Sequence, residues 1–260
     1  MGGIHPSAIV EPGAQIDPSA TVGPFCVVGA QVALGPEVEL KSHVVISGNT
    51  RIGAETVIFP FAVIGEIPQD LKFQGEDSRL EIGARNRIRE HVTMNLGTSG
   101  GGGVTRIGDD GLFMAGCHIA HDAQIGDRVI VVNSAAIAGH CVLEDDVIVG
   151  GLSGVHQFVR IGRGAIIGAV TMVTNDVIPY GLVQAERGKL DGLNLVGLKR
   201  RGVPRADITA LRAAIQMLAQ GDGTFQDRAT RLGGETNSAY VQQIVDFVLA
   251  GSDRSFLTPR

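Results

Sequence analysis

An aliphatic residue recurs every six positions over most of the chain, and no other feature constrains the fold as strongly. The first run holds eleven such positions, from Ile4 to Ile64, without a slip. After two interruptions, the same period continues from Ile107 to Val173. A small or branched side chain usually follows four positions later, as Ala123 follows Ile119. This period matches neither a single helix nor a simple alternating strand, and it is typical of stacked solenoid coils.

Six residues are enough for one short strand and one corner. Three such units close a triangular coil of eighteen residues, and each coil pairs in parallel with the next at a spacing of ~4.8 Å. The repeated aliphatics then point inward as a ladder, and burial of each contributes about 1.5–3 kcal/mol. The sequence therefore predicts an all-β parallel β-helix of between eight and nine coils, stabilised by stacking of neighbours.

The composition agrees with a narrow core. Hydrophobic residues make up 44% of the chain, yet aromatic residues make up only 4% and there is no Trp. Three cysteines, Cys26, Cys117 and Cys141, each stand four residues after a repeat aliphatic, where other coils have Ala, Val or Thr. We interpret them as small core residues rather than as a disulfide or a nucleophile.

Two breaks and one change of period divide the chain. The breaks, at 67–79 and 97–106, predict loops that leave the coil, and the β-helix is expected over residues 1–180. Helical spacing over 193–201, from Ile208 to Leu218, and from Val241 to Val248 predicts a helical domain over 181–260.

Charge and hydropathy restrict the possible partners. The formal net charge of −5 argues against nucleic acid as a partner. No stretch of ~18 consecutive apolar residues is present, and the N-terminus has no charged start followed by an apolar run, so we expect neither a membrane span nor a signal peptide. We therefore expect a cytoplasmic protein.

In a coil of eighteen residues, the spacing of two residues in the sequence predicts whether they are neighbours in the fold. Residues eighteen apart lie one rung apart on the same face, so His121 stacks on Gly139, Gly139 on Gln157, and Asp122 on His140. Histidine can accept a proton near neutral pH. A glycine leaves its N–H open to a substrate oxygen, as an oxyanion site requires. A general base and an oxyanion donor on adjacent rungs fit acyl transfer from a thioester.

Two other classes of function compete with this interpretation. His118, His121, His140 and His156 fall within two to three rungs. Hexapeptide-repeat carbonic anhydrases, which have a similar architecture, use three histidines to hold zinc. A zinc site is therefore the main alternative to an acyl-transfer site. The loops and a basic helix would then have no use, and we favour a site without metal. A purely structural solenoid would need a flat, regular Thr-rich face, which this sequence lacks.

Several motifs occur together in a recognisable order. They are Gln69-Asp70-Leu71-Lys72, His118-Ile119-Ala120-His121-Asp122, Ala138-Gly139-His140, Val155-His156-Gln157-Phe158, and Asn194 followed by Gly197-Leu198-Lys199-Arg200-Arg201-Gly202. With the hexapeptide repeat, they resemble the UDP-N-acetylglucosamine O-acyltransferases of lipid A synthesis, within the hexapeptide acyltransferase superfamily. The match covers nearly the whole chain. The resemblance implies a left-handed β-helix, because periodicity alone gives no hand and parallel crossovers are normally right-handed.

The resemblance also implies a reaction and its residues. It implies transfer of a (3R)-3-hydroxyacyl chain from acyl carrier protein to position 3 of UDP-N-acetylglucosamine, with the carrier's acyl-phosphopantetheine as co-substrate and no cofactor or metal. His121 is implied as the general base, Gly139 N–H as the oxyanion donor and Asp122 as support for the base. The implied substrate contacts are Asp70, Leu71, Lys72, His118, His140, His156, Gln157, Asn194, Arg200 and Arg201.

The family also implies a homotrimer with sites in the clefts between prisms, and an acyl-chain ruler at Ala169. Ala169 has the same hexad position as His121 and Gly139, so we expect it on the same face, beside the acyl path. The basic residues Lys199 to Arg201 are expected to dock the acidic carrier protein.

The chain departs from the family pattern at two places. It has Asn95-Leu96-Gly97-Thr98 where the family often has His-Arg-Gly-Thr, and Val196 where the family has a Glu. The acceptor pocket could therefore be altered. The alternative is an N-acyltransferase that acts on the 3-amino analogue of the UDP-sugar, or at position 2 of an already acylated UDP-glucosamine.

Overall fold

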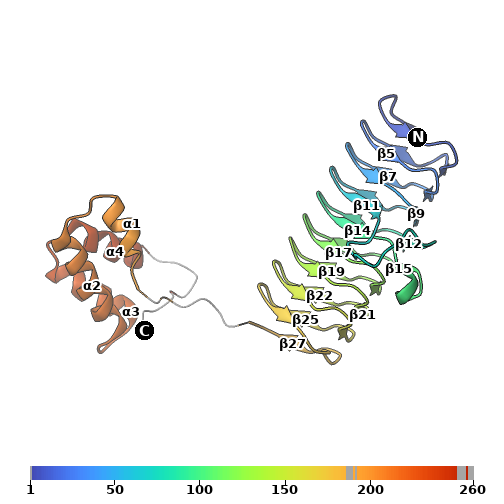
Figure 1. The fold of residues 1–260 in the computed structure, drawn as a ribbon. Coiled ribbons are helices and arrows are strands. Elements are labelled where there is room, and N and C mark those ends of the chain that lie inside the picture. Colours follow the sequence, from blue (N-terminus) through green and yellow to red (C-terminus); the bar gives the residue numbers. More distant parts are fainter. Residues whose placement is uncertain (1, 186–189, 191, 251–255, 257–260) are drawn as a thin grey trace. The chain divides into compact units, whose positions relative to one another are not determined.

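The computed structural model describes residues 2–185, 190, 192–250 and 256. The chain divides into two compact units, Met1–Ala185 and Glu186–Arg260. The first unit is a stack of coils that runs in chain order from the N-terminus to its last strand, coloured blue to yellow in Figure 1.

Each hexad forms one two-residue strand and one corner, as the repeat predicts. In Val45–Ile46, for example, the first side chain faces outward and is half-buried, and the second is fully buried. Strands eighteen residues apart pair in parallel and in register, so that Ile119 lies opposite Ile137 and Ile137 opposite Val155. The chain turns at corners where residues such as Asp122, with φ +60°, adopt the left-handed conformation.

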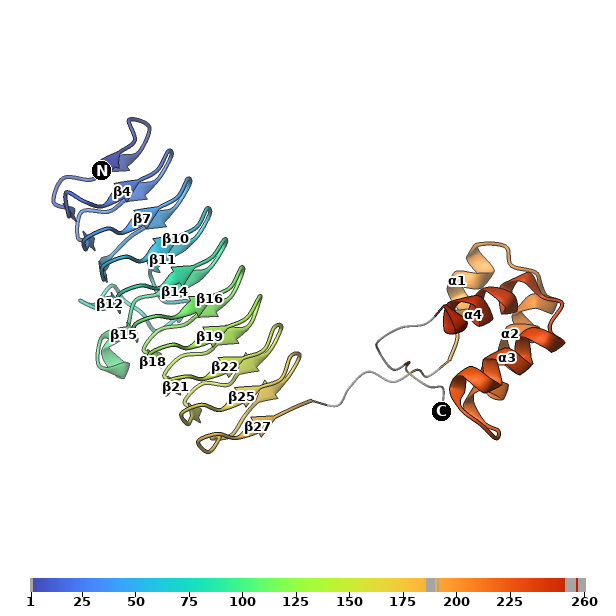
Figure 2. The same cartoon turned by 180° about the vertical axis from the view of Figure 1, so that it is seen from behind.

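The strands form three parallel sheets, one for each side of the prism. The ten-stranded sheet, visible along one side in Figure 2, contains β1 (Gly3–Ile4), β4 (Thr21–Val22), β7 (Glu39–Leu40), β10 (Val57–Ile58), β13 (Arg87–Ile88), β16 (Leu112–Phe113), β19 (Ile130–Val131), β22 (Ile148–Val149), β25 (Ile166–Ile167) and β27 (Leu182–Val183). The nine-stranded sheet contains β2 (Ile9–Val10), β5 (Val27–Val28), β8 (Val45–Ile46), β11 (Val63–Glu66), β14 (Thr93–Asn95), β17 (His118–Ile119), β20 (Ala136–Ile137), β23 (Gly154–Val155) and β26 (Met172–Val173). The eight-stranded sheet contains β3 (Gln15–Ile16), β6 (Ala33–Leu34), β9 (Asn49–Ile52), β12 (Arg79–Ile82), β15 (Val104–Ile107), β18 (Gln124–Ile125), β21 (Val142–Leu143) and β24 (Arg160–Ile161).

The core is the predicted ladder of aliphatics. Ile46, Ile58, Ile88 and Ile137 are completely buried within one continuous cluster. The three cysteines are buried, unpaired members of the same cluster, so their interpretation as core residues is confirmed. Burial raises the pKa of the Cys117 thiol to about 12, which excludes a thiolate nucleophile there at neutral pH.

Both breaks in the repeat are loops, with bounds that differ from those expected. The first loop lies between β11 and β12. The second lies between β14 and β15 and contains the short 3₁₀ helix η1 (Ser99–Gly101). It ends earlier than the expected residue 106, because residues 104–106 pair with Arg79–Glu81 of β12. At the C-terminal end, β27 pairs with β25, so the β-helix runs past the expected residue 180.

The second unit contains four helices around a small core of its own. The spacing of apolar residues correctly predicted α1 (Leu195–Arg200), α2 (Arg205–Ala219) and α4 (Ala239–Leu249). It missed α3 (Phe225–Glu235), which contains two glycines and starts at a capping box between Thr224 and Asp227. Among the described residues, every helix is too short or too polar to cross a bilayer.

Replacing an inward aliphatic should destabilise the β-helix far more than replacing an outward one. Ile137 is completely buried at the centre of the stack, so Ile137→Ala should lower the free energy of unfolding by about 2–5 kcal/mol. Ile166→Ala, outward on β25 and 41% exposed, is the matched control and should cost much less. Denaturant unfolding followed by circular dichroism measures both, and equal shifts would contradict the inward ladder.

Candidate active site

His121 lies at the corner after β17, where the chain leaves the nine-stranded sheet. Its side chain is 15% exposed, and its Nδ1 lies 2.8 Å from Oδ2 of Asp122. Because a carboxylate only accepts hydrogen bonds, Nδ1 carries the proton and Nε2 has a free lone pair. The imidazole is therefore oriented as a general base.

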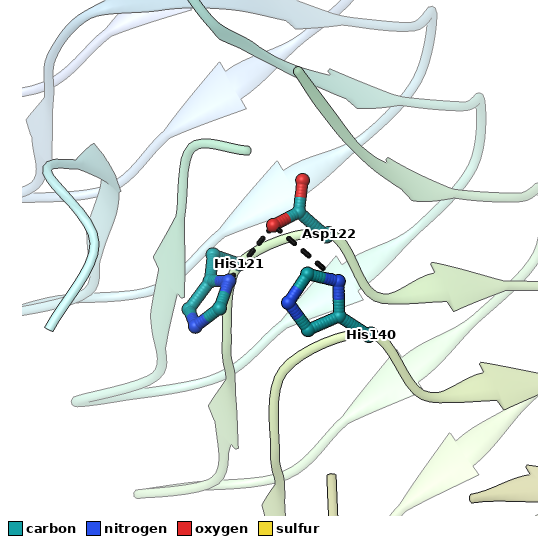
Figure 3. A group of neighbouring side chains, drawn as sticks. All are labelled: His121, Asp122 and His140. Atoms are coloured by element: carbon teal, nitrogen blue, oxygen red, sulfur yellow. Dashed lines mark hydrogen bonds and ion pairs between the residues drawn. The ribbon is translucent and has the colours of Figure 1, made fainter. Parts of the chain in front are cut away.

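Asp122 is held in place by several donors and is almost completely buried. Its Oδ1 accepts a hydrogen bond from Thr98 N–H at 2.9 Å, and its Oδ2 accepts one from the Thr98 hydroxyl at 2.6 Å. Its own N–H donates to Thr105 Oγ1 at 2.7 Å. These hydrogen bonds fix the carboxylate of Asp122, which in turn fixes the orientation of His121. Figure 3 shows both His121 and His140 directed at the same Asp122 oxygen.

Gly139 lies directly beneath the ring of His121, as the coil arithmetic predicts. A Cβ at position 139 would lie 2.6 Å from His121 Cε1 and 2.7 Å from Nε2, so any other residue there would displace the imidazole. Within the described part of the chain, the Gly139 N–H donates to no acceptor. A bare N–H next to the free nitrogen of the base is the arrangement that a developing oxyanion requires.

His140 and Phe158 extend the same corner by two further rungs. His140 packs edge-on against His121, with centroids 5.0 Å apart, and stacks on Phe158 at 4.5 Å. His140 Nδ1 lies 3.7 Å from Asp122 Oδ2. His121, Asp122 and His140 are close enough to be tested as a zinc site. However, His121 Nδ1 and Asp122 Oδ2 lie 2.8 Å apart and form a hydrogen bond. Two tetrahedral zinc ligands, each ~2 Å from the ion, would lie farther apart than this, so zinc would have to break the hydrogen bond.

A cleft of about 500 Å³ opens beside this corner, over the outer face of the nine-stranded sheet. His118, His121, Gly139, His156 and Gln157 all line it, so the structure brings five of the predicted site residues together. Burial and the neighbouring His121 lower the pKa of His118, so this side chain is neutral at neutral pH. The Nδ1 atom of His118 lies 2.7 Å from Thr93 Oγ1. His156 and Gln157 are exposed at the rim.

Asp70 and Lys72 lie in the first loop and border a second hollow of about 330 Å³, together with His140 and Phe158. Asp70 Oδ1 accepts a hydrogen bond from Lys72 N–H at 3.0 Å, which shapes the loop locally. Leu71 projects fully into solvent and does not line either hollow. The two loops are joined where the N–H and hydroxyl of Ser99 donate to Glu76.

The remaining predicted contacts belong to the second unit. Asn194 caps α1, where its Oδ1 accepts a hydrogen bond from Gly197 N–H at 2.9 Å. Arg200 and Arg201 are exposed at the end of this helix, next to the exposed Lys199. Asn194 and Arg201 border an apolar pocket of about 450 Å³ within the helical unit.

The expected position of Ala169 was wrong. It shares its hexad position with His121 but follows β25 of the ten-stranded sheet, whereas His121 follows β17 of the nine-stranded sheet. The corner of Ala169 is therefore a different corner of the prism, at the opposite edge of the nine-stranded sheet. The error arose because the hexad position repeats on all three sides of a coil. Ala169 is exposed and does not line the cleft around His121.

Sequence reasoning missed several residues of the site. Thr98 was noted as part of a motif but not as the partner of Asp122. Asn95 was noted only as a departure from the family pattern. It forms part of the cleft wall, where its Nδ2 donates to the carbonyls of Glu66 and Ile67 and its buried Oδ1 has no partner among the described residues. The outward residues Ala136, Gly154 and Met172 form the cleft floor. Their register with His118 follows from the eighteen-residue repeat.

Comparisons with known proteins agree with this geometry. Residues 176–257 match the family model described as UDP N-acetylglucosamine O-acyltransferase, domain 2. An acyl-[acyl-carrier-protein]–UDP-N-acetylglucosamine O-acyltransferase of Paracoccus denitrificans is 73% identical over 78% of this chain and 77% of its own length. One from Agrobacterium fabrum is 45% identical over 98% of this chain and 95% of its own.

Solved structures extend the comparison to the whole fold. The UDP-N-acetylglucosamine O-acyltransferase of Moraxella catarrhalis is 39% identical, with a TM-score of 0.69 over 98% of this chain and 99% of its own. The UDP-N-acetylglucosamine acyltransferase of Campylobacter jejuni is 36% identical, with a TM-score of 0.68 over 99% of this chain and 100% of its own. The expected fold class, a left-handed parallel β-helix with C-terminal helices, is confirmed. The chain belongs to the acyl-[acyl-carrier-protein]–UDP-N-acetylglucosamine O-acyltransferase family.

Proposed function

We propose that this chain transfers a (3R)-3-hydroxyacyl group from acyl carrier protein to the 3-hydroxyl of UDP-N-acetylglucosamine, the first step of lipid A biosynthesis. The observation that carries the proposal is the ring of His121, fixed by buried Asp122 and packed directly over the bare backbone of Gly139. Family membership supplies the chemical class of donor and acceptor.

The first step is attack on the thioester. Nε2 of His121 takes the proton from the sugar hydroxyl as its oxygen bonds to the acyl carbon. The imidazolium formed is stabilised by Asp122, which keeps its own charge. The carbonyl oxygen becomes an oxyanion, and the Gly139 N–H donates to it.

The second step is collapse of the tetrahedral intermediate. The bond between the acyl carbon and sulfur breaks, the carbonyl re-forms, and the phosphopantetheine thiolate leaves. His121 Nε2 returns its proton to this thiolate. The products are the 3-O-acylated sugar nucleotide and the free thiol of the carrier protein, so the reaction balances without a metal or a bound cofactor.

The other contacts follow from where the side chains lie. We assign Asp70 and Lys72 to the acceptor sugar and its phosphates, since they border the hollow next to His140. His118, His156 and Gln157 line the cleft for the substrates. For Asn194, Arg200 and Arg201 the family resemblance supports contacts to the nucleotide and to phosphopantetheine. The exposed cations at the end of α1 would attract an acidic carrier protein. We place the reaction in the cytoplasm.

A second candidate acceptor is the 3-amino analogue of the UDP-sugar, and Asn95 is the observation that favours it. The amide oxygen of Asn95 is a buried acceptor without a partner in the wall of the cleft. Such an atom costs about 1–3 kcal/mol unless a donor reaches it. An amine can offer one hydrogen to His121 and a second to this oxygen after a small movement of the wall, whereas a hydroxyl has only one.

Assaying three acceptors side by side tests the reaction. We expect acylation of UDP-N-acetylglucosamine from a 3-hydroxyacyl carrier protein, with full turnover in the presence of a chelator. Preference for the 3-amino sugar, or for position 2 of the acylated UDP-glucosamine, would establish the corresponding N-acyltransferase instead. Loss of turnover with chelator, restored by zinc, would support the rival metal site.

Removing the base or its partner should slow the chemical step without unfolding the protein. His121→Ala should lower kcat by about 10²–10⁴-fold. Asp122→Asn should lower it through loss of the correct tautomer and of the negative charge. Asp146→Asn is the control, because Asp146 pairs with Arg128 on the surface and should leave kcat unchanged. Wild-type turnover by His121→Ala would remove this residue from the mechanism.

We also infer that the active form is a homotrimer. Exposed large apolar residues gather at the corner between the ten-stranded and nine-stranded sheets: Phe25, Phe61, Leu152 and Val170. The eight-stranded sheet instead presents charged side chains such as Arg51 and Arg106. Large exposed apolar side chains that recur along one corner are typical of an interface.

Sedimentation should give a mass of three times 27.2 kDa. Leu152→Arg, at the apolar corner, should dissociate the assembly and lower activity, because a buried unpaired charge is costly. Arg51→Glu, on the charged sheet, is the control and should do neither. A wild-type protein that is monomeric and fully active would contradict the trimer.

A further inference from the structure

Two consecutive hydroxyl residues of the second loop each bind a different carboxylate. Thr98 donates its N–H and its hydroxyl to Asp122, at 2.9 and 2.6 Å. Ser99 donates its N–H and its hydroxyl to Oε1 of Glu76, both at 3.3 Å. Asp122 orients the imidazole of His121, whereas Glu76 belongs to the first loop. One dipeptide therefore connects the first loop to the carboxylate that holds the general base.

The half-buried side chain of Glu76 has one oxygen for each loop. Its Oε2 accepts a hydrogen bond from the Gln74 N–H at 2.8 Å, within the first loop, and its Oε1 accepts the two from Ser99. The hydrogen bond from Gln74 lowers the pKa of the Glu76 carboxyl below its usual value, so this side chain is ionised at neutral pH. Hydrogen bonds to a charged acceptor are stronger than those between neutral groups. Glu76 therefore joins the two loops as a charged bridge.

Sheet pairing fixes the ends of both loops but not their tips. The loops start from β11 and β14, which pair with each other, and they end at β12 and β15, which also pair. Between the tips, residues 68–78 and 98–103, the described residues form no other hydrogen bond than the two from Ser99 to Glu76. The position of one tip relative to the other thus depends on Glu76.

Both tips border the hollow that we assign to the acceptor. Asp70, Lys72 and Glu76 line it from the first loop, and Ser99 lines it from the second. An acceptor held by Asp70 and Lys72 would restrict the first loop, because binding reduces the conformations open to the groups that it contacts. Through the bridge, the same acceptor would restrict the loop that holds Asp122.

We propose that Glu76 is a positioning residue that couples occupancy of the acceptor site to the orientation of the general base, through Ser99. The inference rests on the proposed function. In this role Glu76 needs no contact with the reacting atoms, since it acts on His121 through the second loop and Asp122. Its removal should therefore slow the chemical step more than it weakens binding of either substrate.

Glu76→Ala removes the bridge and leaves the strands intact. We expect kcat to fall by about tenfold to a hundredfold, because a small misplacement of a catalytic group is costly. Both KM values should change far less, and the thermal midpoint should not change, because the ends of the loops stay paired. Glu76→Gln keeps one acceptor oxygen and should give an intermediate kcat. Asp77→Ala is the matched control, because Asp77 is the next acidic residue, is exposed and does not line the hollow.

Ser99→Pro removes both donors from the other side of the bridge. Ser99 is the first residue of η1, a position that accepts proline, and Thr98 already has the extended conformation (φ −125°, ψ 157°) that a following proline requires. Ser99→Pro should lower kcat as Glu76→Ala does. The double variant should be no slower than either single variant, since both remove one interaction. Ser99→Ala keeps the N–H and should have a smaller effect.

Steady-state kinetics, with each substrate varied at a saturating concentration of the other, separate the possible outcomes. Wild-type kcat in Glu76→Ala would overturn the coupling. A low kcat in Glu76→Ala but not in Ser99→Pro, or additive losses in the double variant, would show that Glu76 acts on the acceptor directly and would also overturn it. A fall in thermal midpoint that matches the loss of turnover would reduce the bridge to a structural role. A wild-type protein that acylates no UDP-sugar would instead overturn the proposed function, and the inference with it.

Discussion

In-register parallel pairing of coils eighteen residues long is the constraint on which the rest of the structure depends. Each rung is hydrogen-bonded to the next, so a side chain on one rung has a fixed neighbour on the rung below. The ring of His121 therefore lies over Gly139, where a single added carbon would displace it. The repetitive fold supplies the preorganisation that a general base needs, without a loop having to close over it.

The irregular parts of the chain complete what the repeat begins. Regular coils place Asp122 next to His121, but the loop after β14 buries its carboxylate and supplies both Thr98 donors. Gly101 belongs to the same loop and leaves no space for a side chain beside that carboxylate. The Asp122 side chain is 1% exposed, and its hydrogen bonds with these protein groups hold it in the position that orients the imidazole.

The sequence was most informative where one period repeats. The uninterrupted hexads from Ile107 to Val173 fix the register around the site, and from it the contact between His121 and Gly139 follows by counting. Counting failed for Ala169, because equal hexad positions recur on three sides of the prism. It could not find Thr98 as a partner of Asp122, since a loop outside the period has no register. In the helical unit, α3 was not predicted because it contains two glycines, although the capping box between Thr224 and Asp227 marks its start.

A structure with the acylated sugar nucleotide bound would test the central claim most directly. If stacked rungs form the catalytic centre, the oxygen at position 3 of the sugar should lie within hydrogen-bonding distance of His121 Nε2. The acyl carbonyl oxygen should accept a hydrogen bond from Gly139 N–H. A product bound in an orientation that leaves both groups out of reach of the acyl linkage, in a protein that is still active, would contradict the account.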